Sequence, residues 1–303
     1  MNERQRSELA RILPNKIRWD CPMDRLTTFR VGGRAEAVCF PSDLPPLQRT
    51  VSYLHNDSIP YLVMGKGSNV LIKDGGIEGV VIILRGRLSA FEKTGKRGDT
   101  LLAGGGLAIS KLLSYCGLEG LTGSEFLAGI PGTVGGAAFM NAGAFGREMG
   151  DIVQEIMLVS GQGEQIVMPR SQLDFSYRES SVSKGSVIHS VKLKLQRDRK
   201  ERVISRINNN LKKRKVAQPL NVPSAGSVFK NPPKDYAGRL IEEAGLKGAR
   251  VGGAMISPKH ANYIINTGGA KAKDILALMD LARDRVNEAT GILLEPEIKV
   301  IGK

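Results

Sequence analysis

The sequence is poor in the residues on which metal sites, disulfides and base-stacking surfaces depend. Among 303 residues there are only three cysteines and three histidines, and aromatic residues make up 5% of the chain. Cys21, Cys39 and Cys116 are odd in number and far apart, without the paired spacing of a zinc site or a redox motif. No histidine lies near any of them. We therefore expect neither a metal site nor a disulfide.

Long hydrophobic runs are also missing. No segment approaches the roughly 20 apolar residues that a helix needs to span a bilayer. A secretion signal would require an apolar run after its charged start, and none follows the polar stretch at residues 1–6. We expect a soluble protein that stays in the cytoplasm and has no membrane partner.

Acidic residues are outnumbered, since 44 Lys and Arg against 30 Asp and Glu leave a formal net charge of +14. Such a charge alone would allow a nucleic-acid-binding protein. However, the densest basic run, residues 192–215, has Val203, Ile204, Ile207 and Leu211 at helical spacing, with the charges on the other face. Few aromatic residues accompany these charges to stack bases. A solvated helix face explains the run better, and we expect no nucleic-acid partner.

Familiar signatures of nucleotide-binding and hydrolytic enzymes are incomplete. Lys66 is followed by Gly67 instead of the Ser or Thr of a P-loop, and Val70 stands where a dinucleotide-binding turn needs its third glycine. Neither Ser68 nor Ser227 stands in the Gly-x-Ser-x-Gly pattern of a nucleophile elbow, and the histidines show no triad signature. These gaps disfavour an ATPase, a Rossmann dehydrogenase and a hydrolase.

Glycine is abundant, and two loops are especially rich in it. Residues 128–146 (AGIPGTVGGAAFMNAGAFG) carry no charge, and residues 65–69 (GKGSN) follow the apolar run 61–64. Glycine lets main-chain N–H groups approach a ligand closely, and successive N–H groups form an anion-binding concavity. The two loops predict a large cofactor that bears phosphates, whereas turn chemistry alone accounts for the glycines at 104–106.

Hydrophobic patterns divide the chain into three expected domains: residues 1–87, 88–196 and 197–303, the last beginning with a linking helix at 197–215. The first alternates short β-branched runs with a helical stretch, which is typical of an α/β unit. The second contains the glycine-rich loop, and the third a long helical pattern at 274–290 that ends at Gly291.

Three places in the chain could carry chemistry. Arg178 lies in a polar stretch, where its guanidinium could bind an anion. Ser227 stands in the rigid, irregular segment 223–232, which suits holding a ligand better than filling a core. Glu295 and Glu297 lie at the entry to an apolar strand, where burial can raise the pKa of a carboxyl group. A two-residue spacing puts both glutamates on one strand face, so the pattern does not choose between them.

A family resemblance is carried by six segments, in this order along the chain: residues 28–33 (TFRVGG), 65–71 (GKGSNVL), 128–146, 175–178 (FSYR), 224–232 (SAGSVFKNP) and 259–262 (KHAN). Together they resemble the UDP-N-acetylenolpyruvoylglucosamine reductases over nearly the whole chain. The resemblance implies an FAD enzyme that uses NADPH to reduce UDP-N-acetylglucosamine enolpyruvate to UDP-N-acetylmuramate, a precursor of peptidoglycan. The implied fold is α+β, with a two-part FAD-binding region of the vanillyl-alcohol oxidase/p-cresol methylhydroxylase type and a C-terminal α+β substrate-binding domain.

By the same resemblance, both glycine-rich loops and one arginine ahead of them bind non-covalent FAD. The residues concerned are Arg30, Gly65, Gly67, Ser68, Asn69, Gly129, Ile130, Gly132, Gly135, Gly136, Asn141 and Ala142.

The resemblance also implies catalytic roles. Arg178 and a protonated Glu297 would stabilise the dianionic enolate that forms when hydride reaches the substrate. Ser227 would then donate a proton to the α-carbon. Further contacts to the diphosphate or carboxylate of the substrate are implied for Lys215, Lys230 and Asn231.

The choice of Glu297 over Glu295 follows the family pattern, in which the glutamate directly precedes the apolar strand. The stretch between Arg178 and Ser227 leaves no room for a tyrosine-bearing loop that longer members have, so the chain resembles the shorter form. An FAD oxidase of the same fold is the main alternative, which residues 224–232 and the segment of Arg178 disfavour. No histidine or cysteine lies in the glycine-rich loops to attach FAD covalently, and no obligate protein partner is indicated.

Overall fold

The computed structural model describes residues 1–95 and 98–303. These residues divide into two units, each built from separate stretches of the chain. The first comprises Met1–Trp19, Glu36–Gly65 and Gly79–Lys212, and the second comprises Asp20–Ala35, Lys66–Glu78 and Lys213–Lys303. The three-domain division at residues 87/88 and 196/197 stays a prediction.

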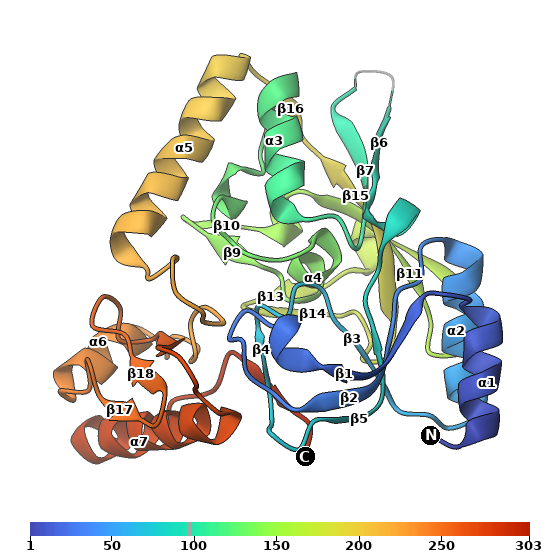
Figure 1. The fold of residues 1–303 in the computed structure, drawn as a ribbon. Helices are drawn as coiled ribbons and strands as arrows, with labels where there is room; N and C mark the ends of the chain where they lie inside the picture. The colour runs from blue at the N-terminus through green and yellow to red at the C-terminus, as the bar shows by residue number, and fades with distance from the viewer. Residues whose placement is uncertain (96–97) are drawn as a thin grey trace. The chain divides into compact units, whose positions relative to one another are not determined.

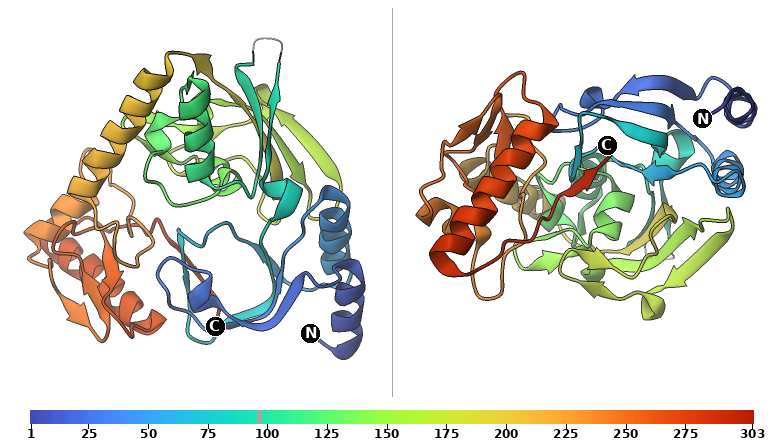
Figure 2. Two further views of the ribbon diagram at one scale, coloured as in Figure 1. Left: turned by 45° about the horizontal axis from the view of Figure 1, so that its top comes forward. Right: turned by 90° about the horizontal axis from the view of Figure 1, so that it is seen from below.

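The N-terminal part of the first unit is an α/β layer. One sheet has the order β1 (Ile17–Pro22), β2 (Arg34–Cys39), β5 (Ile77–Ile82), β3 (Tyr61–Val63). Strands β3 and β5 are parallel. Two helices lie side by side, α1 (Glu3–Ile12) and α2 (Leu44–Asn56) (Figures 1 and 2). The spacing of Leu47, Val51 and Leu54 gives α2 one apolar face, which is buried with Leu9 of α1 and Val80 of β5.

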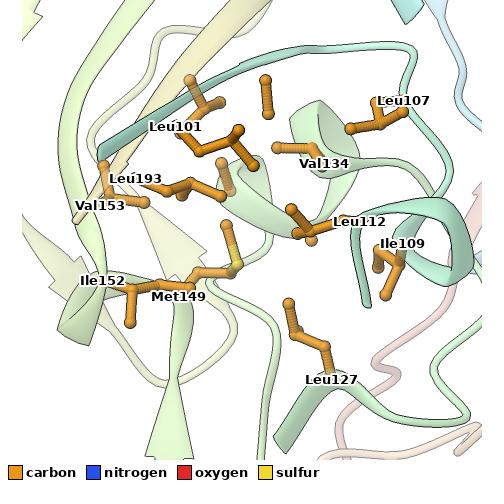
Figure 3. Packing of buried hydrophobic residues seen from close by; sticks show 14 of the residues in the cluster. Leu101, Leu107, Ile109, Leu112, Leu127, Val134, Met149, Ile152, Val153 and Leu193 are labelled. Atoms are coloured by element: carbon orange, nitrogen blue, oxygen red, sulfur yellow. The ribbon is translucent and has the colours of Figure 1, made fainter. Parts of the chain in front are cut away.

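A five-stranded antiparallel sheet forms the rest of the first unit. Its strand order is β12 (Gln165–Pro169), β11 (Val153–Val159), β15 (Val187–Lys194), β7 (Thr100–Gly104), β6 (Phe91–Thr94). Two helices bury their apolar residues with this sheet, α3 (Ile109–Glu119) and α4 (Val134–Phe139). Figure 3 shows Leu101 and Leu193 of the strands in the same cluster as Leu112 of α3 and Val134 of α4.

Short strand pairs connect these elements. They are β8 (Leu121–Thr122) with β16 (Gln196–Arg197), β9 (Gly143–Ala144) with β10 (Arg147–Glu148), and β13 (Phe175–Ser176) with β14 (Glu179–Ser180). The long helix α5 spans Lys200–Ala217. It starts later than the expected helix at 197–215, because Arg197 pairs with Leu121 and the Asp198 N–H donates to the Gly120 carbonyl.

The second unit is centred on two helices, α6 (Ala237–Glu243) and α7 (Ala272–Thr290). It contains the antiparallel sheet β17 (Arg250–Val251), β18 (Ala254–Ile256), β19 (Ile264–Asn266) and the parallel pair β4 (Val70–Ile72) with β20 (Lys299–Ile301). The predicted stop of the last helix is confirmed, because α7 ends where Gly291 adopts a left-handed φ of 71°. Within the described parts of the chain, no helix is long and apolar enough to cross a membrane.

Candidate functional site

The glycine-rich segment 128–146 is held by hydrogen bonds at its centre and near its exit. At its centre, Thr133 caps α4, and its Oγ1 accepts a hydrogen bond from the Gly136 N–H at 3.3 Å. At its exit, the buried Asn141 donates from Nδ2 to the Ser176 carbonyl at 2.9 Å and accepts at Oδ1 from the Gly150 N–H at 3.0 Å. Both polar groups of the Asn141 side chain therefore form hydrogen bonds within the protein.

A cavity of about 330 Å³ lies within the first unit, beside this segment. Its glycine-lined part is formed by Gly65, Gly105, Gly106, Gly135 and Gly136. Apolar side chains line another part: Leu62, Val63, Met64, Ile83, Leu84, Phe139 and Ile188. Polar residues complete the lining: Tyr61, Thr133, Lys184 and Ser186. A cavity with an apolar wall and an exposed backbone suits a ligand that combines flat rings with polar groups. Gly65, Gly135 and Gly136 of the predicted FAD contacts are therefore brought together.

Glycine is needed beside the cavity because backbone segments approach one another closely there. A Cβ on Gly105 would lie 2.0 Å from the Ile188 carbonyl oxygen, and one on Gly135 would lie 2.9 Å from the Gly105 oxygen. The Gly135 N–H donates to that same Gly105 oxygen at 2.9 Å. Glycine is therefore needed at Gly135 because the backbone packs closely there. Its N–H is already hydrogen-bonded within the protein. The turn explanation for residues 104–106 was incomplete, since Gly105 and Gly106 line the cavity.

Replacing Gly105 with alanine should weaken FAD binding about 5- to 150-fold, because a forced fit costs about 1–3 kcal/mol beside the cavity. The measurement is a titration of flavin-free protein with FAD, followed by flavin fluorescence. Gly161→Ala is the matched control, since its Cβ would meet only the Tyr61 hydroxyl, at 3.8 Å. Unchanged affinity in Gly105→Ala would refute the close-packing argument.

His189 directly follows Ile188, a residue that lines this cavity. It stands on β15 at an irregularity of the ladder, because Met157 pairs with Ser190 and Leu158 with Ile188. Its Nδ1 lies 3.0 Å from the Ser190 hydroxyl, and burial lowers its pKa to about 4, so the ring is neutral at pH 7. His189 is thus a buried, neutral histidine that is held by its neighbours within the first unit.

The loop at residues 66–69 belongs to the second unit. Gly67 has a left-handed φ of 61°, and its carbonyl accepts from the Thr28 N–H at 3.1 Å. Asn69 donates from Nδ2 to the Glu297 carbonyl at 3.2 Å. The backbone next to Arg30 is also held, because Asn266 Nδ2 donates to the carbonyl of the preceding residue, Phe29, at 3.0 Å. A predicted flavin contact, Asn69, is thus hydrogen-bonded to the backbone of a predicted catalytic residue, Glu297.

Ser227 and Glu297 lie on paired backbone segments of the second unit. The Glu297 N–H donates to the carbonyl of Val228, the residue after Ser227, at 2.8 Å. Phe229 forms a bridge with Pro296. The structure describes no hydrogen bond that would engage the Ser227 hydroxyl within this unit. Two residues that are 70 positions apart in the sequence are therefore neighbours.

The two glutamates differ in exposure. The Glu295 side chain is 73% exposed and pairs with Lys230 at 3.4 Å, whereas Glu297 is half-buried. The segment of Lys230 and Asn231 also stabilises α6, since Asn231 Oδ1 accepts from the Ala237 N–H at 3.1 Å. These surroundings favour Glu297 as the glutamate that faces a site.

Arg178 lies at the turn between β13 and β14, in the first unit. Its φ of 62° is uncommon for a residue with a side chain and marks a backbone that its surroundings must hold. The guanidinium lies 5.0 Å from the Tyr177 ring centroid, and Nη1 donates to the Gly143 carbonyl at 3.4 Å. The site residues predicted from the sequence are thus distributed over both units.

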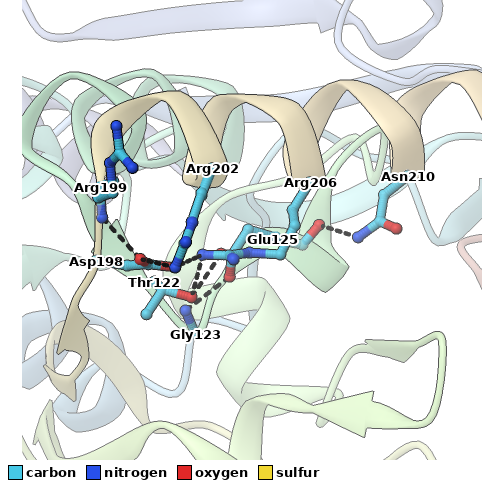
Figure 4. A network of polar contacts seen from close by, with 8 residues as sticks. All are labelled: Thr122, Gly123, Glu125, Asp198, Arg199, Arg202, Arg206 and Asn210. Atoms are coloured by element: carbon cyan, nitrogen blue, oxygen red, sulfur yellow. Dashed lines mark hydrogen bonds and ion pairs between the residues drawn. The ribbon is translucent and has the colours of Figure 1, made fainter.

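A polar network that the sequence did not reveal holds the entry to the glycine-rich segment (Figure 4). Glu125 accepts from Thr122 Oγ1 and from the Gly123 N–H, both at 2.6 Å, and from Arg206 Nε at 2.9 Å. Asn210 of α5 donates to the Glu125 carbonyl at 2.9 Å. The view of α5 as carrying its charges on a solvated face was therefore wrong for Arg206.

Removing this guanidinium with Arg206→Met should lower the free energy of unfolding by about 2 kcal/mol at pH 7, because the buried Glu125 carboxylate loses its partner. The Asp198 carboxylate, which Arg206 Nη2 contacts at 2.6 Å, loses the same partner and adds to the loss. Burial acts to raise the pKa of Glu125, but hydrogen bonds from Thr122, Gly123 and Arg206 outweigh it, and the pKa is lowered. The stabilisation is therefore complete above the unfolded pKa of about 4.3 and is lost as the pH falls through the folded value.

Urea unfolding at pH 7 and in a series below pH 5 measures this difference. Arg199→Met is the control, since Arg199 and its partner Glu201 are both largely exposed, and we expect a change below about 0.5 kcal/mol. A gap between wild type and Arg206→Met that stays constant down to pH 3 would contradict the assignment to Glu125.

Known proteins share both the sequence and the fold. Residues 218–301 match the family described as UDP-N-acetylenolpyruvoylglucosamine reductase, C-terminal domain, and residues 35–168 match an FAD binding domain. A reductase of that name from Nitrosospira multiformis is 41% identical, with 95% of this chain and 89% of the relative covered. Another from Clostridioides difficile is 41% identical, with 95% and 94% covered.

Solved structures agree with these relatives. The crystal structure of UDP-N-acetylenolpyruvylglucosamine reductase from Thermus caldophilus superposes with a TM-score of 0.82 at 37% identity, covering 95% of this chain and 98% of that chain. An alkyldihydroxyacetonephosphate synthase shares the fold only, with a TM-score of 0.51 at 17% identity over 65% of this chain and 44% of that chain. The expected fold class is confirmed.

The glycine-lined cavity and the paired segments of Ser227 and Glu297 thus occur in a chain whose relatives match it along nearly their whole length. The chain belongs to the UDP-N-acetylenolpyruvoylglucosamine reductase family.

Proposed function

We propose that this chain uses NADPH to reduce the enolpyruvyl group of UDP-N-acetylglucosamine enolpyruvate, forming UDP-N-acetylmuramate for peptidoglycan synthesis in the cytoplasm. The observation that carries the proposal is the 2.8 Å hydrogen bond from the Glu297 N–H to the Val228 carbonyl. It places the backbone of the candidate proton donor, Ser227, next to that of the candidate acid.

The residues beside the cavity fit FAD. The close approach at Gly105 and Gly135 keeps one part of the lining free of side chains, and the apolar side chains beside it give a flat ring a surface to lie against. Bound FAD would supply the hydride chemistry that links NADPH to the β-carbon of the substrate. The contacts expected for Arg30, Ser68, Gly129, Ile130, Gly132 and Ala142 remain part of this proposal.

The task of the protein is to stabilise negative charge on the substrate. Reduction at the β-carbon pushes electrons onto the α-carbon and its carboxylate, and groups already aimed at that charge lower its free energy. We assign this role to the Arg178 guanidinium and to Glu297 in its protonated form. Ser227 donates the proton to the α-carbon, because an enolate is basic enough to take a proton from a well-placed hydroxyl.

Three further residues are proposed to bind the substrate diphosphate or carboxylate: Lys215, Lys230 and Asn231. Lys230 pairs with the exposed Glu295, an interaction that solvent weakens and that an anionic ligand could replace. Lys259 Nζ donates to the Lys215 carbonyl, which brings a second basic residue to that end of α5. Together these cations favour a doubly charged diphosphate.

An absorbance spectrum under anaerobic conditions tests the proposal. The yellow protein should bleach with NADPH and regain its colour when UDP-N-acetylglucosamine enolpyruvate is added. Bleaching without recovery would point to another reductase or to an FAD oxidase. A colourless protein that FAD cannot reconstitute, but that binds DNA in a steeply salt-dependent way, would overturn the flavoenzyme assignment.

A further inference from the structure

Asn262 is a buried amide, 3% exposed, that lies directly against the residues after Ser227. Its Oδ1 accepts from the Phe229 N–H at 2.9 Å, and its Nδ2 donates to the Phe229 carbonyl at 2.8 Å. Its own carbonyl accepts from the Val228 N–H at 2.9 Å. Asn262 therefore uses side chain and backbone together to hold two consecutive residues.

The opposite side of the same segment is held by backbone. The Glu297 N–H donates to the Val228 carbonyl and the Lys230 N–H to the Glu295 carbonyl, both at 2.8 Å. The segment after Ser227 thus lies between the chain at 295–297 and Asn262. Loss of the amide would leave Phe229 with an unpaired buried N–H and carbonyl on one side.

The segment before Ser227 is held by other contacts. The Pro223 carbonyl accepts from the Asn266 N–H at 2.9 Å, and Ala225 is buried. Gly226 has a left-handed φ of 79°, and a Cβ there would meet nothing within 4 Å. Glycine is the residue with the widest backbone freedom, and Gly226 separates that restrained part from Ser227. The residues directly after Ser227, which Asn262 holds, therefore fix its position from the other side.

Asn262 is itself held in place. Its N–H donates to His260 Nδ1 at 3.2 Å, and the Tyr263 N–H donates to the His260 carbonyl at 3.0 Å. Ser257, 1% exposed, accepts at Oγ from the Lys259 N–H at 3.2 Å. This loop gives the amide one fixed orientation, with acceptor and donor both directed at Phe229.

From these contacts we infer that Asn262 is a positioning residue that sets the Ser227 hydroxyl for proton transfer to the substrate α-carbon. The inference rests on the proposed function of Ser227. Proton transfer needs heavy atoms within hydrogen-bond reach, and a displacement of about 1 Å can cost about 100-fold in rate. Asn262 would act on the rate of this step, not on cofactor binding.

Asn262→Asp tests the inference because it changes one atom group only. A carboxylate can accept from the Phe229 N–H but repels the Phe229 carbonyl. We expect stopped-flow reoxidation of the reduced enzyme by the enolpyruvyl substrate to slow about 10- to 100-fold, with NADPH-driven flavin reduction unchanged. Asn262→Gln keeps donor and acceptor on a longer side chain, should give a smaller loss, and serves if the Asp variant does not fold.

Two readouts separate positioning from general destabilisation. First, in a Ser227→Ala background Asn262→Asp should slow reoxidation less than twofold, because a residue that acts through Ser227 has nothing left to position. Second, the α-carbon of the product should lose its single configuration in Asn262→Asp, since water replaces the oriented hydroxyl. Asp74→Ala is the control, because Asp74 stabilises the same unit by accepting from the Ala272 and Lys273 N–H groups at the start of α7.

Equal slowing by Asn262→Asp with and without Ser227, or equal slowing by Asp74→Ala, would overturn the inference and leave Asn262 a structural role. If the wild-type enzyme itself is not reoxidised by the enolpyruvyl substrate, the proposed function fails instead. The two failures are therefore distinguishable in one set of measurements.

Discussion

Ser227→Ala should slow reoxidation of the reduced enzyme by the enolpyruvyl substrate about 10²- to 10⁴-fold, the usual contribution of a positioned general acid. Flavin reduction by NADPH should proceed at the wild-type rate, because this half of the reaction needs no proton at the substrate α-carbon. Stopped-flow absorbance, with each half of the reaction started separately, measures both rates.

Ser224→Ala is the matched control for that variant. Ser224 lies in the same segment and is also half-buried, and no role in the reaction is proposed for it. We expect both of its half-reactions to run within about twofold of wild type. Wild-type reoxidation in Ser227→Ala would remove this hydroxyl from the reaction.

Glu297→Gln should lower the rate of substrate reduction about 10²- to 10³-fold, the typical cost of losing one group aimed at developing negative charge. Glutamine has the shape of glutamic acid but holds its hydrogen-bonding protons on a much weaker acid, so it stabilises the enolate carboxylate less. The kcat of the full reaction should fall more than the KM changes, because the charge develops only in the transition state.

Glu295→Gln provides the comparison. Its side chain is 73% exposed and pairs with Lys230, so we expect at most a small change in KM and an unchanged kcat. If Glu295→Gln lost activity and Glu297→Gln kept it, the assignment would have to be exchanged between the two glutamates.

Local elements were predictable where a pattern depends only on neighbouring residues. The helical spacing in 274–290 and the stop at Gly291 correspond to α7, and the apolar run 61–64 corresponds to β3. The N-terminal helix α1 was not predicted, because it buries few of its residues and most of its surface is polar. The ordered motifs also identified the family, since their order along the chain is itself a specific signal.

The charged face of α5 shows where pattern reasoning failed. Helical spacing indicates which side of a helix is polar but not what lies opposite that side. Arg206 finds Glu125, which is 81 residues away, and the pairing anchors the entry to the glycine-rich segment. The glycines at 104–106 are a second case in which local pattern was not sufficient. Only the close approach of the Ile188 carbonyl, seen in the folded chain, shows why Gly105 cannot carry a side chain.

From its sequence alone, this chain could be assigned a cofactor with phosphates, a family, and Arg178, Ser227 and Glu297 as candidate catalytic residues, because these depend on residue types and their order. The folded structure was needed to show that Glu297 is the half-buried glutamate and that Asn262 holds the segment after Ser227. Both depend on hydrogen bonds between residues 33 to 69 positions apart, and no local spacing encodes which distant backbone groups will meet.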